Sequence, residues 1–146
     1  LDLLDRLFAG PVLLTESVRQ EILAEPVPPD EAEEIGRFLT SASVEKIHAV
    51  KRYAAALSRA DHETLALAER RKAELVLTDD RLVREMAAVA GARPMGTLGV
   101  LVLAMRKGLL TKREAQSQVE ALVRHHRFRI SVELYDKVLQ TIRKGG

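Results

Sequence analysis

The sequence contains no cysteine and very few aromatic residues, and both absences narrow the range of functions. Without cysteine, the 146-residue chain forms neither disulfides nor thiolate metal sites, so we expect a reducing compartment, the cytoplasm. Aromatic residues make up only 3%, which argues against a base-stacking surface for single strands. The longest apolar run, 98–105, is too short to span a bilayer, so we expect no membrane partner.

Charge is unevenly distributed along the chain, although the net charge is only +2. Residues 1–103 carry 13 basic and 17 acidic side chains, whereas residues 104–146 carry 10 basic and 4 acidic, a balance of +6. This asymmetry indicates a polyanion-binding region, with a basic helical surface that binds nothing as the alternative. We single out Arg124, Arg127 and Arg129 as candidate nucleic-acid contacts.

Hydrophobic periodicity and turn residues predict a single α/β domain over residues 1–146, with 111–146 as a C-terminal helical extension. Strands are predicted at 11–14, 44–50, 75–78 and 92–95. Helices are predicted at 1–8, 16–24, 30–39, 51–57, 61–72, 80–90, 98–107, 112–125 and from 131 onward. Strands that alternate with helices indicate a short parallel sheet.

Two adjacent carboxylates, Asp79 and Asp80, follow the clearest strand in the segment LVLTDDRLVR. Asp is favoured at helix starts, so a plain helix cap is one interpretation. The other depends on position, because a helix runs antiparallel to the strand that follows it, which brings Glu63 back towards this pair. The predicted helix that carries Glu21 also starts at this edge of the sheet. We therefore expect a pocket of Glu21, Glu63 and Asp80, with Asp61 and Asp79 alongside.

Converging carboxylates stay ionised only if protons or a hard cation compensate their charge. Ligands that are all oxygens favour Mg²⁺ or Mn²⁺ over Zn²⁺. Such ions activate water and stabilise phosphoryl oxygens, which is the chemistry of metal-dependent nucleases. Spacing alone leaves both the cap and the metal site open.

Three further residues are candidate nucleic-acid contacts near these acids. Thr97 belongs to the segment Gly96-Thr97-Leu98-Gly99, whose free N–H groups at a helix start suit a phosphate, although the pattern favours a plain N-cap. Arg81 and Arg84 suit contacts with phosphates or with the acids, and a local ion pair within the helix is the alternative.

Four segments in order resemble the PIN-domain family, metal-dependent ribonucleases that include the VapC-type toxins of toxin–antitoxin pairs. They are VLLTESVRQEI (12–22), ADHETLALA (60–68), LVLTDDRLVREMA (75–87) and MGTLGVLVLAMRKGLL (95–110). Glu63 matches the principal acid of the second segment, and Asp61 the acid before it. Asp80 matches the usual metal-site Asp of the third, and Glu21 is the acid of the first helix.

The resemblance implies a three-layer α/β/α fold and hydrolysis of RNA phosphodiester bonds with Mg²⁺ or Mn²⁺. It implies Glu21, Glu63 and Asp80 as catalytic and metal-binding residues, with Asp61 and Asp79 as further ligands. It also implies a homodimer and an antitoxin protein as partners.

The sequence departs from the family pattern at its front. The family opens with a central strand that ends in Asp, and this strand is not in the sequence; Asp2 and Asp5 fall in the following helix and do not replace it. A catalytically incomplete module that binds nucleic acid or protein is therefore the alternative function. A receiver domain also places paired Asp after a strand, but near its start and with a late strand-end Lys that this chain lacks.

Overall fold

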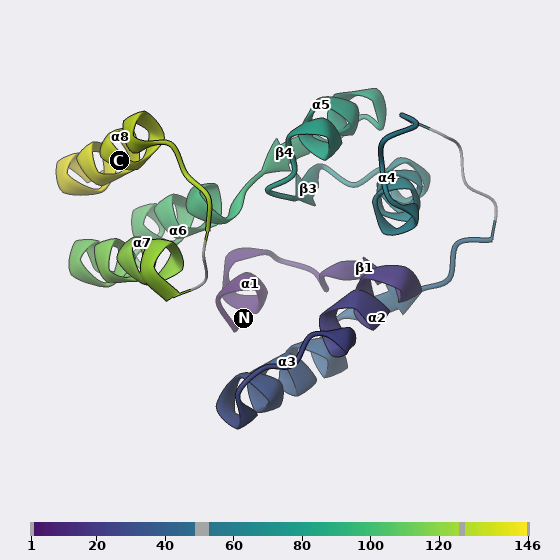
Figure 1. Ribbon diagram of the computed structural model, residues 1–146, viewed down its shortest axis with the longest axis horizontal. Coiled ribbons are helices and arrows are strands. Elements are labelled where there is room, and N and C mark those ends of the chain that lie inside the picture. Colours follow the sequence, from purple (N-terminus) through teal and green to yellow (C-terminus); the bar gives the residue numbers. More distant parts are fainter. Residues whose placement is uncertain (1, 49–52, 126–127, 146) are drawn as a thin grey trace. The chain divides into compact units, whose positions relative to one another are not determined.

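The computed structural model describes residues 2–48, 53–125 and 128–145 (Figure 1). The described residues form eight helices and four strands, which divide into an N-terminal unit, Leu1–Met95, and a C-terminal unit, Gly96–Gly146. The predicted α/β class with short parallel sheets and additional C-terminal helices is confirmed. Whether residues 1–146 behave as one domain stays a prediction.

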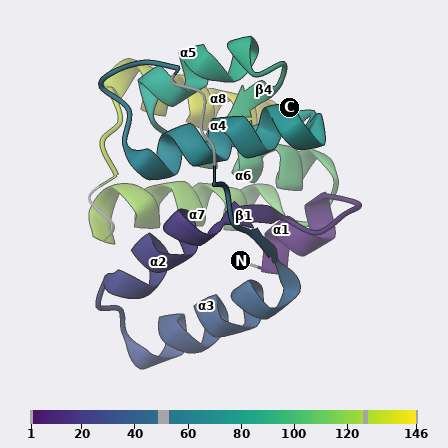
Figure 2. The same cartoon turned by 90° about the vertical axis from the view of Figure 1, so that its right-hand side faces the viewer.

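The N-terminal unit alternates strands and helices in nearly the predicted positions. Its elements are α1 (Asp2–Leu7), β1 (Leu13–Thr15), α2 (Glu16–Ala24), α3 (Pro29–Ser41), β2 (Ser43–Glu45), α4 (Arg59–Arg71), β3 (Leu75–Leu77), α5 (Arg81–Val89) and β4 (Arg93–Met95). In Figure 2 the N-terminal unit shows α4 beside α5, with which it is in contact.

Two predictions for the segment between β2 and α4 were wrong. The strand predicted at 44–50 ends at Glu45, and its last two residues, 49 and 50, lie outside the described residues. The helix predicted at 51–57 is absent from its described part, 53–57, where the chain turns instead. Leu57 donates its N–H to the carbonyl of Ala54 at 3.2 Å and is buried, so the chain folds inward just before α4 starts.

The strands pair in parallel, as predicted, but the described residues form two two-stranded sheets instead of one. β1 pairs with β2, where Leu14 lies opposite Val44, and β3 pairs with β4, where Val76 lies opposite Pro94. α4 contacts both β1 and β3.

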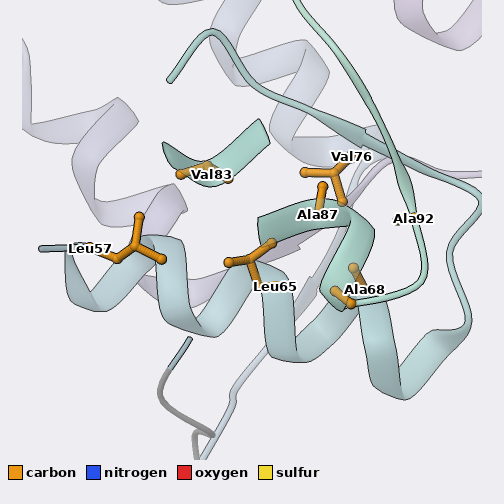
Figure 3. Packing of buried hydrophobic residues seen from close by; sticks show 8 residues of the cluster. Leu57, Leu65, Ala68, Val76, Val83, Ala87 and Ala92 are labelled. Carbon is orange, nitrogen blue, oxygen red and sulfur yellow. The ribbon is translucent and has the colours of Figure 1, made fainter. Parts of the chain in front are cut away.

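The core of the N-terminal unit lies between α4, α5, β3 and β4 (Figure 3). Leu65 of α4 and Ala87 of α5 are fully buried, and Val83 is 1% exposed. Val83, Ala87 and Ala90 recur at the spacing of one helix face.

The C-terminal unit consists of three helices that lie side by side (Figure 1). They are α6 (Thr97–Arg106), α7 (Lys112–His125) and α8 (Val132–Lys144), all close to their predicted bounds. Thr111 and Glu114 form the expected capping box, since the Glu114 N–H donates to Thr111 Oγ1 and the Thr111 N–H donates to Glu114 Oε2. Among the described helices, none has the length and apolar character that a membrane span requires.

Truncation of Leu65 tests the position of this core. Leu65→Ala removes a fully buried side chain from a packed interior, so it should lower the free energy of unfolding by about 2–5 kcal/mol. Leu23→Ala is the matched control, because Leu23 is 55% exposed on α2, and it should cost less than about 0.5 kcal/mol. Urea denaturation measures both, and equal losses would contradict the described core.

Candidate active site

Glu63 is the one buried charged side chain among the described residues, with 2% of its surface exposed. Its carboxylate accepts two hydrogen bonds. Ser17 Oγ donates to Oε2 at 2.6 Å, and Arg59 Nε donates to Oε1 at 2.7 Å. Both oxygens of a buried carboxylate are thus satisfied, as a buried charge requires.

Two helix caps bring these three side chains together. Thr15 ends β1 and caps α2, since its hydroxyl accepts from the Val18 N–H at 3.2 Å, which places Ser17 in the first turn of α2. Ser58 and Asp61 form a reciprocal capping box that starts α4 and places Arg59 one turn before Glu63. Because α2 and α4 are in contact, the start of one helix meets the start of the other.

The surroundings of Glu63 keep its carboxylate charged. Burial raises the pKa of Glu63, but the hydrogen bonds from Ser17 and Arg59 and the positive charge of Arg59 outweigh it and leave the pKa below its ordinary value. The side chain of Arg59 is 83% exposed, so solvent screens much of its attraction. Glu63 is therefore an ionised group held in a dry position at neutral pH.

The other predicted acids have different surroundings. Asp80 is the N-cap of α5, where its Oδ1 accepts from the Val83 N–H at 2.9 Å, so the helix-start interpretation of the Asp79–Asp80 pair is confirmed for Asp80. Asp61 belongs to the capping box of α4 and accepts from both the N–H and the hydroxyl of Ser58. Glu21 and Asp79 are exposed.

The structure does not assemble these acids into one pocket. Among the described residues, no three acidic or histidine side chains lie together so that they could hold a metal ion. Glu63 instead meets Ser17 and Arg59, and Asp61 and Asp80 serve as caps. The roles of Glu21, Glu63 and Asp80 as metal ligands stay a prediction.

The predicted nucleic-acid contacts lie mostly at exposed positions. Arg81 pairs with Glu85 one turn later, with Nε and Oε1 3.1 Å apart, as in the local-pair interpretation. Arg84, Arg124 and Arg129 are exposed, Thr97 is the first residue of α6 after its N-cap Gly96, and Arg127 lies outside the described residues.

Sequence reasoning missed two of the three residues at this site. The contact between Ser17 and Glu63 joins positions 46 residues apart, and no local pattern predicts such a pairing. Arg59 and Glu63 are spaced i and i+4 on one helix, which is the spacing of a helical ion pair and was available in the sequence.

Comparison with known protein families identifies the family of this chain. The family model of a PIN domain matches residues 1–144, so the chain belongs to the PIN-domain family. No curated protein and no solved structure matches the chain. The PIN domain is a nuclease-type fold, which indicates nucleic-acid binding, and PIN domains generally use divalent metal ions.

Stability against pH tests the charge state of Glu63. Its ordinary pKa is 4.5 and its folded pKa is lower, so the ionised group stabilises the fold above pH 4.5, and this contribution is lost as pH falls through the folded pKa. Glu63→Gln removes the contribution. The parent should therefore lose more free energy of unfolding than the variant between about pH 6 and pH 3.

The control for this measurement is Glu33→Gln, which removes an exposed carboxylate of α3 and should follow the parent. Hydrogen bonds from the backbone and hydroxyl of Thr111 also lower the pKa of Glu114, but Glu114 is present in all three proteins and its effect cancels. Equal losses in the parent and in Glu63→Gln would show that Glu63 is not held ionised.

Proposed function

We propose that this protein is a ribonuclease of the PIN type that hydrolyses RNA phosphodiester bonds. The observation that carries the proposal is Glu63, a buried and ionised carboxylate in the segment ADHETLALA, which resembles the family's segment with its principal acid. Glu63 is buried and charged, whereas its partner Arg59 is mostly exposed, and groups with perturbed pKa values are concentrated at functional sites.

We propose Mg²⁺ or Mn²⁺ as the cofactor because of the chemistry of the candidate ligands. The carboxylates of Glu21, Glu63 and Asp80, with Asp61 and Asp79, offer only oxygen atoms, which hard cations prefer. Among the described residues no three of these carboxylates meet, so they do not form a metal site as they stand, although each Glu63 oxygen accepts only one hydrogen bond and keeps a lone pair for an ion. The chain's own contribution is thus the charge on Glu63 and its fixed orientation by Ser17 and Arg59.

The C-terminal unit supplies the proposed attraction for RNA. Its 10 basic and 4 acidic side chains give it a balance of +6, whereas the N-terminal unit has a balance of −4. A polyanion is attracted to such a surface with a strong dependence on salt. Arg124, Arg127, Arg129 and Thr97 are the proposed contacts of this unit, and Arg81 and Arg84 are the proposed contacts of the N-terminal unit.

Protein partners are part of the proposal as well. A homodimer is supported by apolar side chains that α8 leaves in solvent, because Val132 is 77% and Leu134 45% exposed. A role as the toxin of a toxin–antitoxin pair, with an antitoxin protein as the further partner, rests on the family resemblance alone.

The second candidate is a PIN-type module that binds nucleic acid or protein without cleaving it. The absence of a three-carboxylate group among the described residues favours it. The two candidates differ in one observable, which is turnover of RNA.

Cleavage of labelled RNA by the natural protein in Mn²⁺ or Mg²⁺ separates the candidates. We expect cleavage by the parent and none above background by Glu63→Gln, which keeps the size of the side chain but removes its charge. RNA binding by this variant should remain, because the basic side chains are unchanged. The exposed Glu33→Gln is the matched control and should cleave as the parent does.

Two results would contradict the ribonuclease. If the parent leaves RNA intact but binds it, the binding module is the correct function. If Glu63→Gln cleaves as fast as Glu33→Gln, the activity does not depend on the buried carboxylate.

A further inference from the structure

An open cavity of about 550 Å³ lies in the C-terminal unit, and none of its lining residues has been assigned to a site above. Its walls come from the first half of α7 and the last turn of α8. The lining residues are Lys112, Arg113, Gln116, Ser117, Glu120, Ile142 and Arg143. Its volume falls within the range of about 300–1,000 Å³ that small-molecule sites occupy.

A single cross-link fixes one end of this cavity. Lys112 Nζ donates to the carbonyl oxygen of Arg143 at 3.0 Å and so joins the start of α7 to the end of α8. Gly145 makes room for it. A Cβ at Gly145 would lie 3.1 Å from Lys112 Nζ, and its φ of +87° is a conformation that other residues rarely adopt. The two helix ends are therefore held at a defined separation.

The lining is basic, and two of its charges form no ion pair with any of the described residues. Among the described residues, neither Arg113 nor Arg143 has a carboxylate partner, and both side chains are exposed. The one acid of the lining, Glu120, accepts a hydrogen bond from Gln116 Nε2 at 3.0 Å. The cavity thus combines the guanidinium groups of Arg113 and Arg143 with one ammonium and the hydroxyl of Ser117.

These groups suit phosphate oxygens in particular. A guanidinium group presents its N–H donors as a planar fork that matches two oxygens of a phosphate, and a nearby ammonium adds charge. An acidic protein segment would also need apolar contacts at the centre of its interface. The single apolar side chain of the lining, Ile142, is only 1% exposed, so the lining favours a nucleic-acid backbone over a protein.

We propose that the α7–α8 cavity binds the phosphodiester backbone of single-stranded RNA through Arg113 and Arg143, with Lys112 and Ser117 as additional donors. The choice of RNA rests on the proposed function. The cavity adds a phosphate subsite to the surface residues already named, within a unit whose balance of +6 attracts the strand.

The test is the binding of fluorescein-labelled oligouridylate of about 12 nucleotides to the full chain, measured by anisotropy in EDTA at several salt concentrations. The test variant is Arg113→Gln/Arg143→Gln. The slope of log K against log salt is negative, and the loss of two phosphate contacts on a single strand should reduce its magnitude by about 1.4. At about 0.1 M salt this corresponds to binding that is on the order of 25-fold weaker.

The matched control is Arg106→Gln/Lys137→Gln, which removes the same charge from exposed positions of the same unit outside the cavity. It should weaken binding much less than the cavity variant does. Equal losses in the two variants would mean that overall charge alone attracts RNA, and would overturn the cavity as a site.

A second variant, Arg113→Lys/Arg143→Lys, keeps the charge but replaces the planar guanidinium groups by ammonium groups. It is the test variant if the glutamine variant does not fold. We expect weaker binding at an unchanged salt slope, and parental affinity would overturn the proposed contacts. Unlabelled polyuridylate should displace the labelled strand. Displacement by polyglutamate at the same concentration of charge would overturn RNA as the ligand.

These measurements require neither metal nor turnover. Their outcome is therefore independent of whether the protein cleaves RNA. If RNA is never cleaved but the cavity variant binds it worse than the control, the cavity stands and the ribonuclease does not. If RNA is cleaved but the cavity variant and the control bind it alike, only the cavity is overturned.

Discussion

The N-terminal unit depends on how it satisfies one buried negative charge. Removing a carboxylate from water costs several kcal/mol unless hydrogen bonds and opposite charge replace the lost hydration. Ser17 and Arg59 provide this replacement for Glu63, one from α2 and one from the preceding turn of α4. The caps at Thr15 and Ser58 set where both helices start, so they also decide whether these side chains reach Glu63.

Local signals in the sequence were sufficient for most of the fold. Helices with strong caps, such as α7 with its Thr111 capping box, were predicted within a residue or two. The segment 44–57 was not, because its apolar residues fit a strand, a short helix or an inward turn equally, and the burial of Leu57 decided the outcome. The division of the strands into two pairs depends on contacts between distant residues, which periodicity does not show.

The candidate site was predictable only in part, for a related reason. Burial of Glu63 was not visible in its neighbours, since Asp61, two residues away, takes part in a cap on a more exposed surface. The motif of adjacent Asp79 and Asp80 contained both a cap and a candidate ligand, and the structure uses Asp80 as the cap. The basic C-terminal third was predictable from composition, whereas its cavity depends on the meeting of two helix ends.

Ser17 and Arg59 hold the carboxyl group of Glu63 in its ionised form. The pKa of this carboxyl group is the most direct measure of their effect. NMR titration of the side-chain carboxyl carbon, assigned by comparison with Glu63→Gln, gives that pKa in the folded protein. We expect a value below 4.5 in the parent and a higher value in Ser17→Ala, because the variant lacks one of the stabilising hydrogen bonds. A value above 4.5 in the parent, or the same value in both proteins, would contradict it.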